Sequence, residues 1–363
     1  MVKKTHHSHL FVDISSHGFG HLSQAGPVLD ALVRRAPGLR LTVRSGLSAE
    51  RLRSRISAPF EHIPGRGDFG FVMVDAMRID LEATGEAYRA FHAGWPARVE
   101  AEAAFLRRLA PDLALTDVAY LPLAGAARAG IPALAMCSLN WADLFAHFFG
   151  REGWAEPIHG QMLAAYRSAA RFIRLTPAMA MPDLPNAVAV PPVASIGQVR
   201  RAELCRRIGA KNDEILALIA FGGFDADLNA AAWPVAPGVR FLAPRAWNLA
   251  RHDAAAIEAA GMSFTDLLRS VDAVLTKPGY GTFTEAAYNG AAVLYLRRGD
   301  WPEQDCLIEW LAANARSRET DFGTLARNGI GAEVVKLLAR REPPRPPPGG
   351  AEKAARTIAA YLP

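Results

Sequence analysis

The sequence predicts an α/β protein built from two doubly wound, Rossmann-like domains that face a cleft. Three observations lead to this class. Short runs rich in leucine and β-branched residues alternate with longer amphipathic stretches along the chain. A proline-rich segment at residues 177–192 interrupts the alternation, which then restarts. The length of 363 residues also exceeds what one hydrophobic core usually holds.

In the first half of the chain, apolar spacing separates strands from helices. Strands are predicted at residues 10–14, 39–43, 113–116 and 133–136. Helices are predicted at residues 22–34, 99–109 and 121–129. Such alternation produces a parallel sheet with helical crossovers.

The same alternation returns after the proline-rich segment. Strands are predicted at residues 215–221, 239–242, 272–276 and 292–296. Helices are predicted at residues 264–271, 282–289, 303–315 and 331–339. We therefore place an N-terminal domain at 1–190 and a C-terminal domain at 191–350.

Residues 343–350 form a stiff spacer rich in proline, and an alanine-rich helix is expected at 351–363. Two interpretations of this end are equally consistent with the sequence. It is either a solvated tail or a helix that crosses back and packs on the N-terminal domain.

Composition excludes several classes of protein. Half of the residues are hydrophobic and 21% are charged, which excludes a disordered or coiled-coil chain. No apolar run reaches the ~18 residues of a membrane span, and residues 1–9 lack the apolar stretch of a signal peptide. Cys137, Cys205 and Cys306 are far apart, which is typical of buried thiols in a reducing compartment. We expect a soluble cytoplasmic protein.

The net charge of +5 is mildly basic and comes mostly from arginine. The basic residues are scattered, without the dense runs or interleaved aromatic residues typical of nucleic-acid binding. We therefore expect no nucleic-acid partner. An anionic small molecule and an anionic membrane surface both fit this charge.

The first predicted strand ends in a glycine turn flanked by histidines. The turn reads Ser15-Ser16-His17-Gly18-Phe19-Gly20-His21. Ligands of open α/β sheets bind where strands end and helices begin, and Gly18 and Gly20 allow the backbone to approach a ligand closely. His17 or His21 can supply a base near neutral pH. The alternative is a tight turn with half-exposed histidines.

A second glycine turn follows the predicted strand at 272–276. It reads Lys277-Pro278-Gly279-Tyr280-Gly281-Thr282-Phe283-Thr284-Glu285 and leads into a helix. A phosphate or diphosphate fits the positive end of such a helix. Glu285 can accept hydrogen bonds from ribose hydroxyls, or it can form a capping box with Thr282. The absence of a Gly-Lys-Ser/Thr ending excludes a P-loop.

Two further loops are expected at the same edge of the second sheet. Gly222 and Gly223 follow the strand at 215–221, so their amides are placed to reach the same phosphates. Glu303 and Gln304 open a predicted helix and are suited to bind sugar hydroxyls. The alternative for this pair is an ordinary acidic first turn that complements the helix dipole.

These motifs resemble those of nucleotide-sugar glycosyltransferases of the GT-B fold. The second turn is similar to the donor-binding segment of the bacterial transferase that adds N-acetylglucosamine to the lipid-linked peptidoglycan precursor. A nearer likeness is to the glycosyltransferase-like N-terminal region of plant L-arabinokinases and their bacterial relatives. The shared motifs are His17-Gly18-Phe19-Gly20-His21, Pro111-Asp112-Leu113 through Asp117, Gly130-Ile131-Pro132 and Asn140-Trp141. The likeness is to the transferase-like region, so it implies no sugar-kinase activity.

The resemblance implies a role for each matching position. The donor diphosphate, of a nucleotide sugar that is UDP-linked in the resembled transferases, would bind at Gly279, Tyr280, Gly281 and Thr282, and the ribose at Glu285. Phe264 would lie beside the base, and Glu303 and Gln304 beside the transferred sugar. Gly18 and Gly20 would line the cleft opposite. Trp301-Pro302 before Glu303 departs from the usual glycine or histidine, which leaves the identity of the sugar open.

Glycosyl transfer needs a base for the acceptor hydroxyl and positive charge for the departing diphosphate. His17 or His21 is the predicted base, with Asp117 at the end of a strand as its partner or as an alternative base. Lys277 or Arg245 is the predicted cation. We expect no cofactor and a metal-independent reaction, and we assign no metal ligands.

Alternative functions are a nucleotide-sugar epimerase or hydrolase and a non-catalytic nucleotide-sugar-binding protein. The acceptor is a small molecule or a lipid-linked sugar. The aromatic stretch at 140–149 is either core or a platform for a hydrophobic acceptor. Peripheral contact with the inner face of the membrane is the third interpretation of that stretch.

Overall fold

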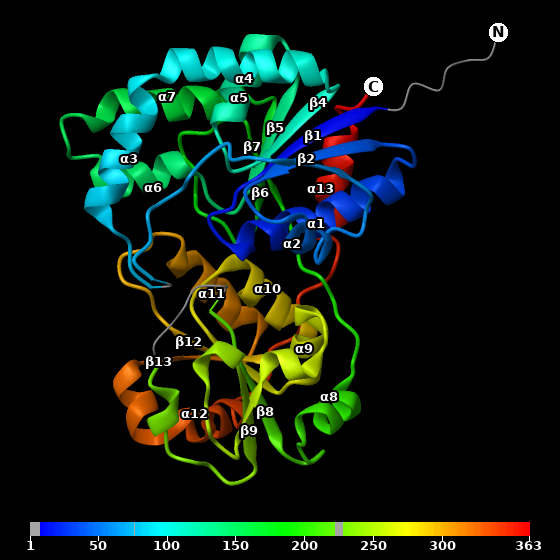
Figure 1. Ribbon diagram of the computed structural model, residues 1–363, viewed down its shortest axis with the longest axis vertical. Helices are drawn as coiled ribbons and strands as arrows, with labels where there is room; N and C mark the ends of the chain where they lie inside the picture. Colours follow the sequence, from blue (N-terminus) through cyan, green and yellow to red (C-terminus); the bar gives the residue numbers. More distant parts are fainter. Residues whose placement is uncertain (1–7, 76, 222–227) are drawn as a thin grey trace. The chain divides into compact units, whose positions relative to one another are not determined.

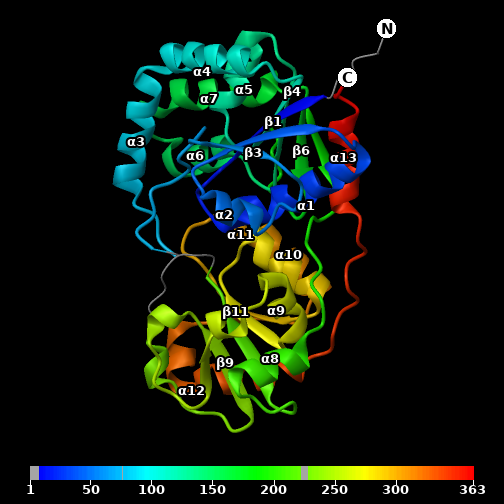
Figure 2. The same ribbon diagram turned by 45° about the vertical axis from the view of Figure 1, so that its right-hand side comes forward.

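The computed structural model describes residues 8–75, 77–221 and 228–363, and divides the chain into two compact units (Figures 1 and 2). The first unit comprises the described residues up to Met73, then Ile79–Val193 and Gly349–Pro363. The second comprises the described residues of Val74–Arg78 and of Ala194–Pro348. Each unit is built on its own parallel sheet.

The first unit contains a seven-stranded parallel sheet in the order β3-β2-β1-β4-β5-β6-β7. The strands are β1 (His9–Ile14), β2 (Arg40–Ser45), β3 (Glu61–Pro64), β4 (Leu113–Asp117), β5 (Ala133–Cys137), β6 (Arg171–Leu175) and β7 (Ala187–Val190). Every residue of β1, β4 and β5 is buried, as expected for a parallel sheet covered on both faces. The strand order reverses between β1 and β4, which makes their carboxyl ends the switch point where ligands bind in such sheets.

Helices cover both faces of this sheet (Figures 1 and 2). They are α1 (Phe19–Arg35), α2 (Ala49–Arg53), α3 (Leu81–Ala93), α4 (Trp95–Leu109), α5 (Leu121–Ala129), α6 (Trp141–Phe149), α7 (Ala155–Ser168) and α13 (Gly350–Ala359). The terminal helix α13 packs against α1, and Ala354, Ala355 and Ile358 are fully buried there. An ion pair of 2.9 Å between Arg34 and Glu352 joins the two helices.

The second unit contains a six-stranded parallel sheet in the order β10-β9-β8-β11-β12-β13. The strands are β8 (Ile215–Ile219), β9 (Val239–Ala243), β10 (Ala254–Ala256), β11 (Ala273–Thr276), β12 (Ala292–Leu296) and β13 (Ser317–Thr320). The helices are α8 (Arg201–Ile208), α9 (Phe264–Ser270), α10 (Tyr280–Asn289), α11 (Gln304–Asn314) and α12 (Phe322–Leu338), with short 3-10 turns at Ala230–Ala232, Arg245–Trp247 and Ile257–Ala260. Here the switch point lies between β8 and β11.

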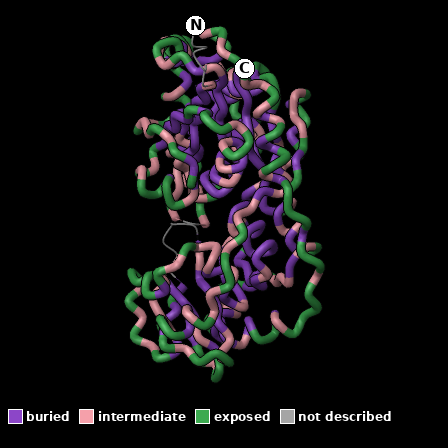
Figure 3. Tube along the Cα trace, turned by 90° about the vertical axis from the view of Figure 1, so that its right-hand side faces the viewer, coloured by how far each residue is buried: buried purple, intermediate pink, exposed green. Residues whose placement is uncertain are grey.

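Buried residues are concentrated in the interior of each unit (Figure 3), and the central strands β1, β4, β5, β11 and β12 consist entirely of them. The two doubly wound α/β sheets are therefore as predicted, although β3, β6, β7, β10 and β13 were not anticipated. No helix of the described chain combines the length and apolar character needed to cross a bilayer.

Several predicted helix starts were wrong: α4 begins at Trp95 and α12 at Phe322, and two further errors concern the glycine turns. The helix α1 begins at Phe19, so Gly20 and His21 belong to its first turn and not to a loop before it. The helix α10 begins at Tyr280 with Gly279 as its N-cap, which places Thr282 and Glu285 inside the helix. A capping box needs its threonine at the N-cap, so the alternative role of Thr282 and Glu285 is excluded.

Candidate active site

A buried histidine and a buried carboxylate meet at the switch point of the first sheet. The register places Ile14 of β1 beside Asp117, the last residue of β4. His21, in the first turn of α1, is 6% exposed, and its Nδ1 lies 3.3 Å from Asp117 Oδ1. Asp117 is fully buried. The structure therefore joins two of the three residues that the sequence assigned to proton transfer.

The electrostatics of this pair make His21 basic. Burial by itself lowers the pKa of His21, but the charge of Asp117 and the hydrogen bond to it raise that pKa well above its usual value. The carboxylate also fixes the imidazole orientation, since the Nδ1–H donates to it. Nε2 is then the nitrogen left to exchange a proton with a ligand.

Cys137, the last residue of β5, lies under the same pair. Its Sγ is 3.8 Å from His21 Nδ1, and burial raises the pKa of the thiol to about 11. The ligand atoms of His21, Asp117 and Cys137 all lie within 4.8 Å of one another, so these three buried residues have a spacing that a metal ion can use. The sequence did not anticipate this cluster, because its members come from three separate segments.

His17 occupies a different environment from His21. It is half-buried, its Nε2 lies 3.1 Å from the backbone oxygen of Phe71, and its ring centre is 6.4 Å from that of His21. Gly70 has φ +66°, and a Cβ there would lie 2.5 Å from the His17 ring. The loop around Gly70 therefore fixes where His17 lies, and Asp117 contacts the other histidine.

Sequence reasoning missed Asp68, which fixes the position of side chains beside the two histidines. Asp68 accepts hydrogen bonds from Trp141 Nε1 at 2.6 Å and from Ser15 Oγ at 3.0 Å. The Trp141 ring, fully buried, lies 5.1 Å from the His17 ring and 5.7 Å from the His21 ring. Asp68 lies in the β3–α3 loop, where no local pattern in the sequence indicated a role.

The glycines of the first turn differ in their surroundings. Gly18 is the N-cap of α1 and is half-buried, whereas Gly20 is exposed. A Cβ at Gly20 would meet nothing within 4 Å, so packing within the protein does not require a glycine there. The open space is consistent with the predicted close approach of a ligand.

The aromatic stretch that follows is mainly core. Trp141, Phe145 and Phe149 are buried, and Phe148 is half-buried with its ring 5.4 Å from that of Phe71. Most of this helix face is therefore taken up by packing within the first unit.

In the second unit, α10 begins at the switch point between β8 and β11. Gly279 caps it with extended backbone, and no side chain caps this end. Helix geometry directs the amides of the first turn outward, and the dipole makes this end positive. These are the properties that a phosphate-binding turn requires.

Two cations accompany this helix end. Lys277 immediately precedes the turn, and burial, followed by the charge of Arg298, lowers its pKa to about 7. Arg298 follows β12, is 8% exposed, and lies with its guanidinium carbon 4.0 Å from the Trp301 ring centre. Sequence reasoning named Lys277 but missed Arg298. Arg245, the other predicted cation, is exposed after β9.

The residues predicted to contact sugar and ribose are buried. Gln304 spans its own loop, because its Oε1 accepts from Arg298 N at 3.1 Å and its Nε2 donates to the Gly299 oxygen at 2.9 Å. Glu303 accepts from Trp301 Nε1 at 3.3 Å. Glu285 is 1% exposed in α10. In this structure Gln304 and Glu303 thus hold the loop that carries Arg298.

The remaining predicted residues have mixed outcomes. Phe264 is half-buried as the first residue of α9. Gly222 and Gly223 lie outside the described residues. So do Asp225 and Asp227, an Asp-x-Asp spacing that the metal-independent prediction overlooked and that is a familiar way to hold a divalent cation.

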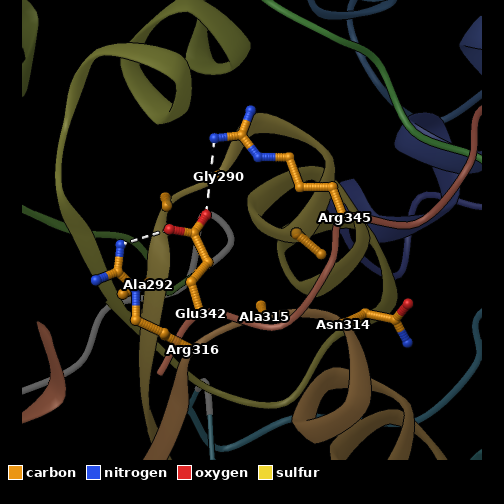
Figure 4. A pocket seen from close by; sticks show the side chains of 9 residues that line it. Gly290, Ala292, Asn314, Ala315, Arg316, Glu342 and Arg345 are labelled. Atoms are coloured by element: carbon orange, nitrogen blue, oxygen red, sulfur yellow. Dashed lines mark hydrogen bonds and ion pairs between the residues drawn. The ribbon is translucent and has the colours of Figure 1, made fainter. Parts of the chain in front are cut away.

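A separate pocket lies at the opposite end of β12, beside Ala292 and the end of α10 (Figure 4). Its charges are already paired, because Glu342 lies between Arg316, at 2.9 Å, and Arg345, at 3.8 Å. Arg345 also covers Gly290, the C-cap of α10. This pocket is apart from the switch point.

No family model matches the chain. The L-arabinokinase of Arabidopsis thaliana is 26% identical over 302 residues, which are 82% of this chain and 29% of that protein. The chain thus spans less than a third of the length of this relative.

Solved structures match almost the full length. The glycosyltransferase of kitacinnamycin matches with a TM-score of 0.66 at 15% identity, covering 99% of this chain and 100% of that one. The calicheamicin glycosyltransferase CalG4 matches with a TM-score of 0.60 at 16% identity, covering 98% and 94%. LpCGTa, solved in complex with UDP, matches with a TM-score of 0.57 at 17% identity, covering 97% and 94%. The chain has the GT-B fold, as the sequence motifs predicted.

Proposed function

We propose that this protein transfers a glycosyl group from a nucleoside-diphosphate sugar to an acceptor hydroxyl. The observation that carries the proposal is the buried His21–Asp117 pair at the switch point of the first sheet. The glycosyltransferase fold and the UDP found in the matched LpCGTa structure support the donor class.

The transfer assigns one role to each site. His21 accepts the proton of the acceptor hydroxyl, and the acceptor oxygen forms a bond to the anomeric carbon of the donor sugar. The bond between that carbon and the diphosphate oxygen breaks, and its electron pair leaves with the nucleoside diphosphate. Asp117 stabilises the protonated imidazole that results. The amino end of α10 and Lys277 bind the departing diphosphate.

In this proposal, residues of the second unit bind the donor. Gly279, Tyr280, Gly281 and Thr282 hold the diphosphate, Glu285 the ribose, and Phe264 lies beside the base. Glu303 and Gln304 lie nearest the sugar, and Gly222 and Gly223 contribute amides. The donor is UDP-linked in this proposal, the acceptor is a small molecule or a lipid-linked sugar, and no metal ion takes part.

The experiment measures release of the nucleoside diphosphate from a panel of UDP-, dTDP- and GDP-sugars, with a panel of small-molecule and lipid-linked hydroxyl acceptors and with water alone as the measure of hydrolysis. His21→Gln is the informative variant, because its amide still donates to Asp117 but cannot act as a base. Turnover is expected to fall about 100-fold or more. His252→Gln, at an exposed histidine of the second unit, is the matched control and keeps full turnover.

Three outcomes contradict the proposal in different ways. Full turnover by His21→Gln would show that His21 is not the catalytic base. Binding of a nucleotide sugar without turnover indicates a non-catalytic binding protein. Conversion of the donor to an isomer without release of diphosphate indicates an epimerase.

A further inference from the structure

Arg298 is a buried guanidinium with no carboxylate at ion-pair distance among the described residues, although the charge of Glu303 acts on it from farther away. It is 8% exposed, its Nε makes no hydrogen bond, and within the described chain it forms no ion pair. Arg44 is equally buried but binds Asp13 at 2.5 Å and Glu102 at 2.7 Å. Arg251 similarly binds Asp253 at 2.7 Å. Arg44 and Arg298 are the two buried arginines of the described residues, and of these two only Arg44 has a carboxylate at ion-pair distance.

A buried cation without a carboxylate in contact destabilises the fold, because the hydration that burial removes is only partly replaced. Burial lowers the pKa of Arg298 to about 10, which reflects the same loss. The Trp301 face, 4.0 Å away, offsets part of the cost. The remainder would be offset by an anion that enters from solution.

The register of the sheet places Arg298 beside the turn that starts α10. Thr276, the last residue of β11, pairs with Tyr295 of β12, so the segments after both strands leave the sheet at the same edge. Lys277 and Arg298 are close enough for the charge of one to lower the pKa of the other. Glu303 is the acidic group that attracts both.

We propose that Arg298 binds the diphosphate of the nucleotide ligand at the amino end of α10, together with Lys277. This inference rests on the proposed function and adds a residue to its donor site. A guanidinium can donate two parallel hydrogen bonds to phosphate oxygens, and these strengthen where water is excluded. Gln304 positions the arginine, because it bonds the backbone on both sides of the Arg298–Gly299 peptide.

The test is isothermal titration of UDP and UMP, or of the corresponding pair for whichever base the wild-type protein binds most tightly. Arg298→Gln is expected to weaken binding of the diphosphate about 10- to 100-fold and binding of the monophosphate much less. Arg298→Lys keeps the charge but loses the two-point geometry, so it is expected to weaken diphosphate binding several-fold. Arg206→Gln, at an exposed arginine of α8, makes the same change of charge and leaves both affinities unchanged.

The outcomes separate this inference from the proposal beneath it. If the wild-type protein binds none of the nucleotides, the proposed function fails and this inference fails with it. If the wild-type protein binds a diphosphate and folded Arg298→Gln and Arg298→Lys bind it equally well, Arg298 has no part in the site and the proposed function stands. Equal weakening of diphosphate and monophosphate would place Arg298 away from the terminal phosphate and overturn the inference.

Discussion

Replacing Arg298 by methionine is expected to stabilise the protein in the absence of nucleotide. Burial lowers the pKa of this arginine from its usual range to about 10, and each pKa unit corresponds to about 1.4 kcal/mol, so burying the charge costs on the order of 3 kcal/mol. The Trp301 contact returns about 1–2 kcal/mol. Methionine retains an apolar stem without the charge, so the free energy of unfolding should rise by about 1–2 kcal/mol.

Chemical denaturation at pH 7, with calorimetry as a second probe, measures this difference. A gain of this size raises Tm by roughly 2–4 °C per kcal/mol for a domain of 150–250 residues. The control is Arg251→Met, which removes an arginine that has a carboxylate partner and also faces an aromatic ring, Phe241. That variant leaves Asp253 buried without its cation and should lose about 3–5 kcal/mol.

The two substitutions therefore change stability in opposite directions if burial without a partner is what distinguishes Arg298. A loss of stability in Arg298→Met comparable to that in Arg251→Met would refute the reasoning. In saturating nucleotide, the wild-type protein should become more stable than Arg298→Met, because a ligand stabilises most the protein that binds it most tightly.

Two further predictions concern proton transfer and metal ions. Asp117→Asn removes the charge that raises the pKa of His21, so the acid limb of the pH–turnover profile should move to lower pH while the maximal rate falls. If the acid limb does not move, the His21–Asp117 pair does not determine the pH dependence of turnover. Treatment with EDTA should leave turnover unchanged, since Lys277 and the amides of α10 neutralise the diphosphate. Loss of turnover that zinc or manganese restores would instead indicate a metal at the His21–Asp117–Cys137 cluster or at Asp225 and Asp227.

The alternation of strands and helices was enough to predict both sheets, because buried parallel strands leave a simple apolar pattern. It did not identify β3 (Glu61–Pro64), an edge strand with no buried residue, or β10 (Ala254–Ala256), which consists of three alanines. Strands this short lie below the length at which periodicity can be measured. Their existence depends on pairing with the neighbouring strand, which is a tertiary effect.

The candidate site was predictable where its residues lie next to glycine turns. His21 and Gly279 belong to local motifs. A glycine turn that directly follows a strand must lie at the carboxyl end of that strand, where ligands of such sheets bind. Asp68 and Arg298 carry no such signal. Their roles depend on burial and on partners distant in sequence: Trp141 is 73 residues from Asp68, and Lys277 contributes to the charge around Arg298 from a different strand.

Both switch points carry charged side chains that have lost their hydration. In the first unit, buried Asp117 is stabilised by His21, and the same interaction makes that imidazole a stronger base. In the second unit, Arg298 is buried with no carboxylate at ion-pair distance among the described residues, and its Nε makes no hydrogen bond. A sequence selected for folding alone would place apolar residues of similar volume at such positions, because buried ionic groups rarely stabilise a protein. The unpaired cation is therefore best explained by a ligand of opposite charge, and the paired histidine by a reaction that needs a proton acceptor.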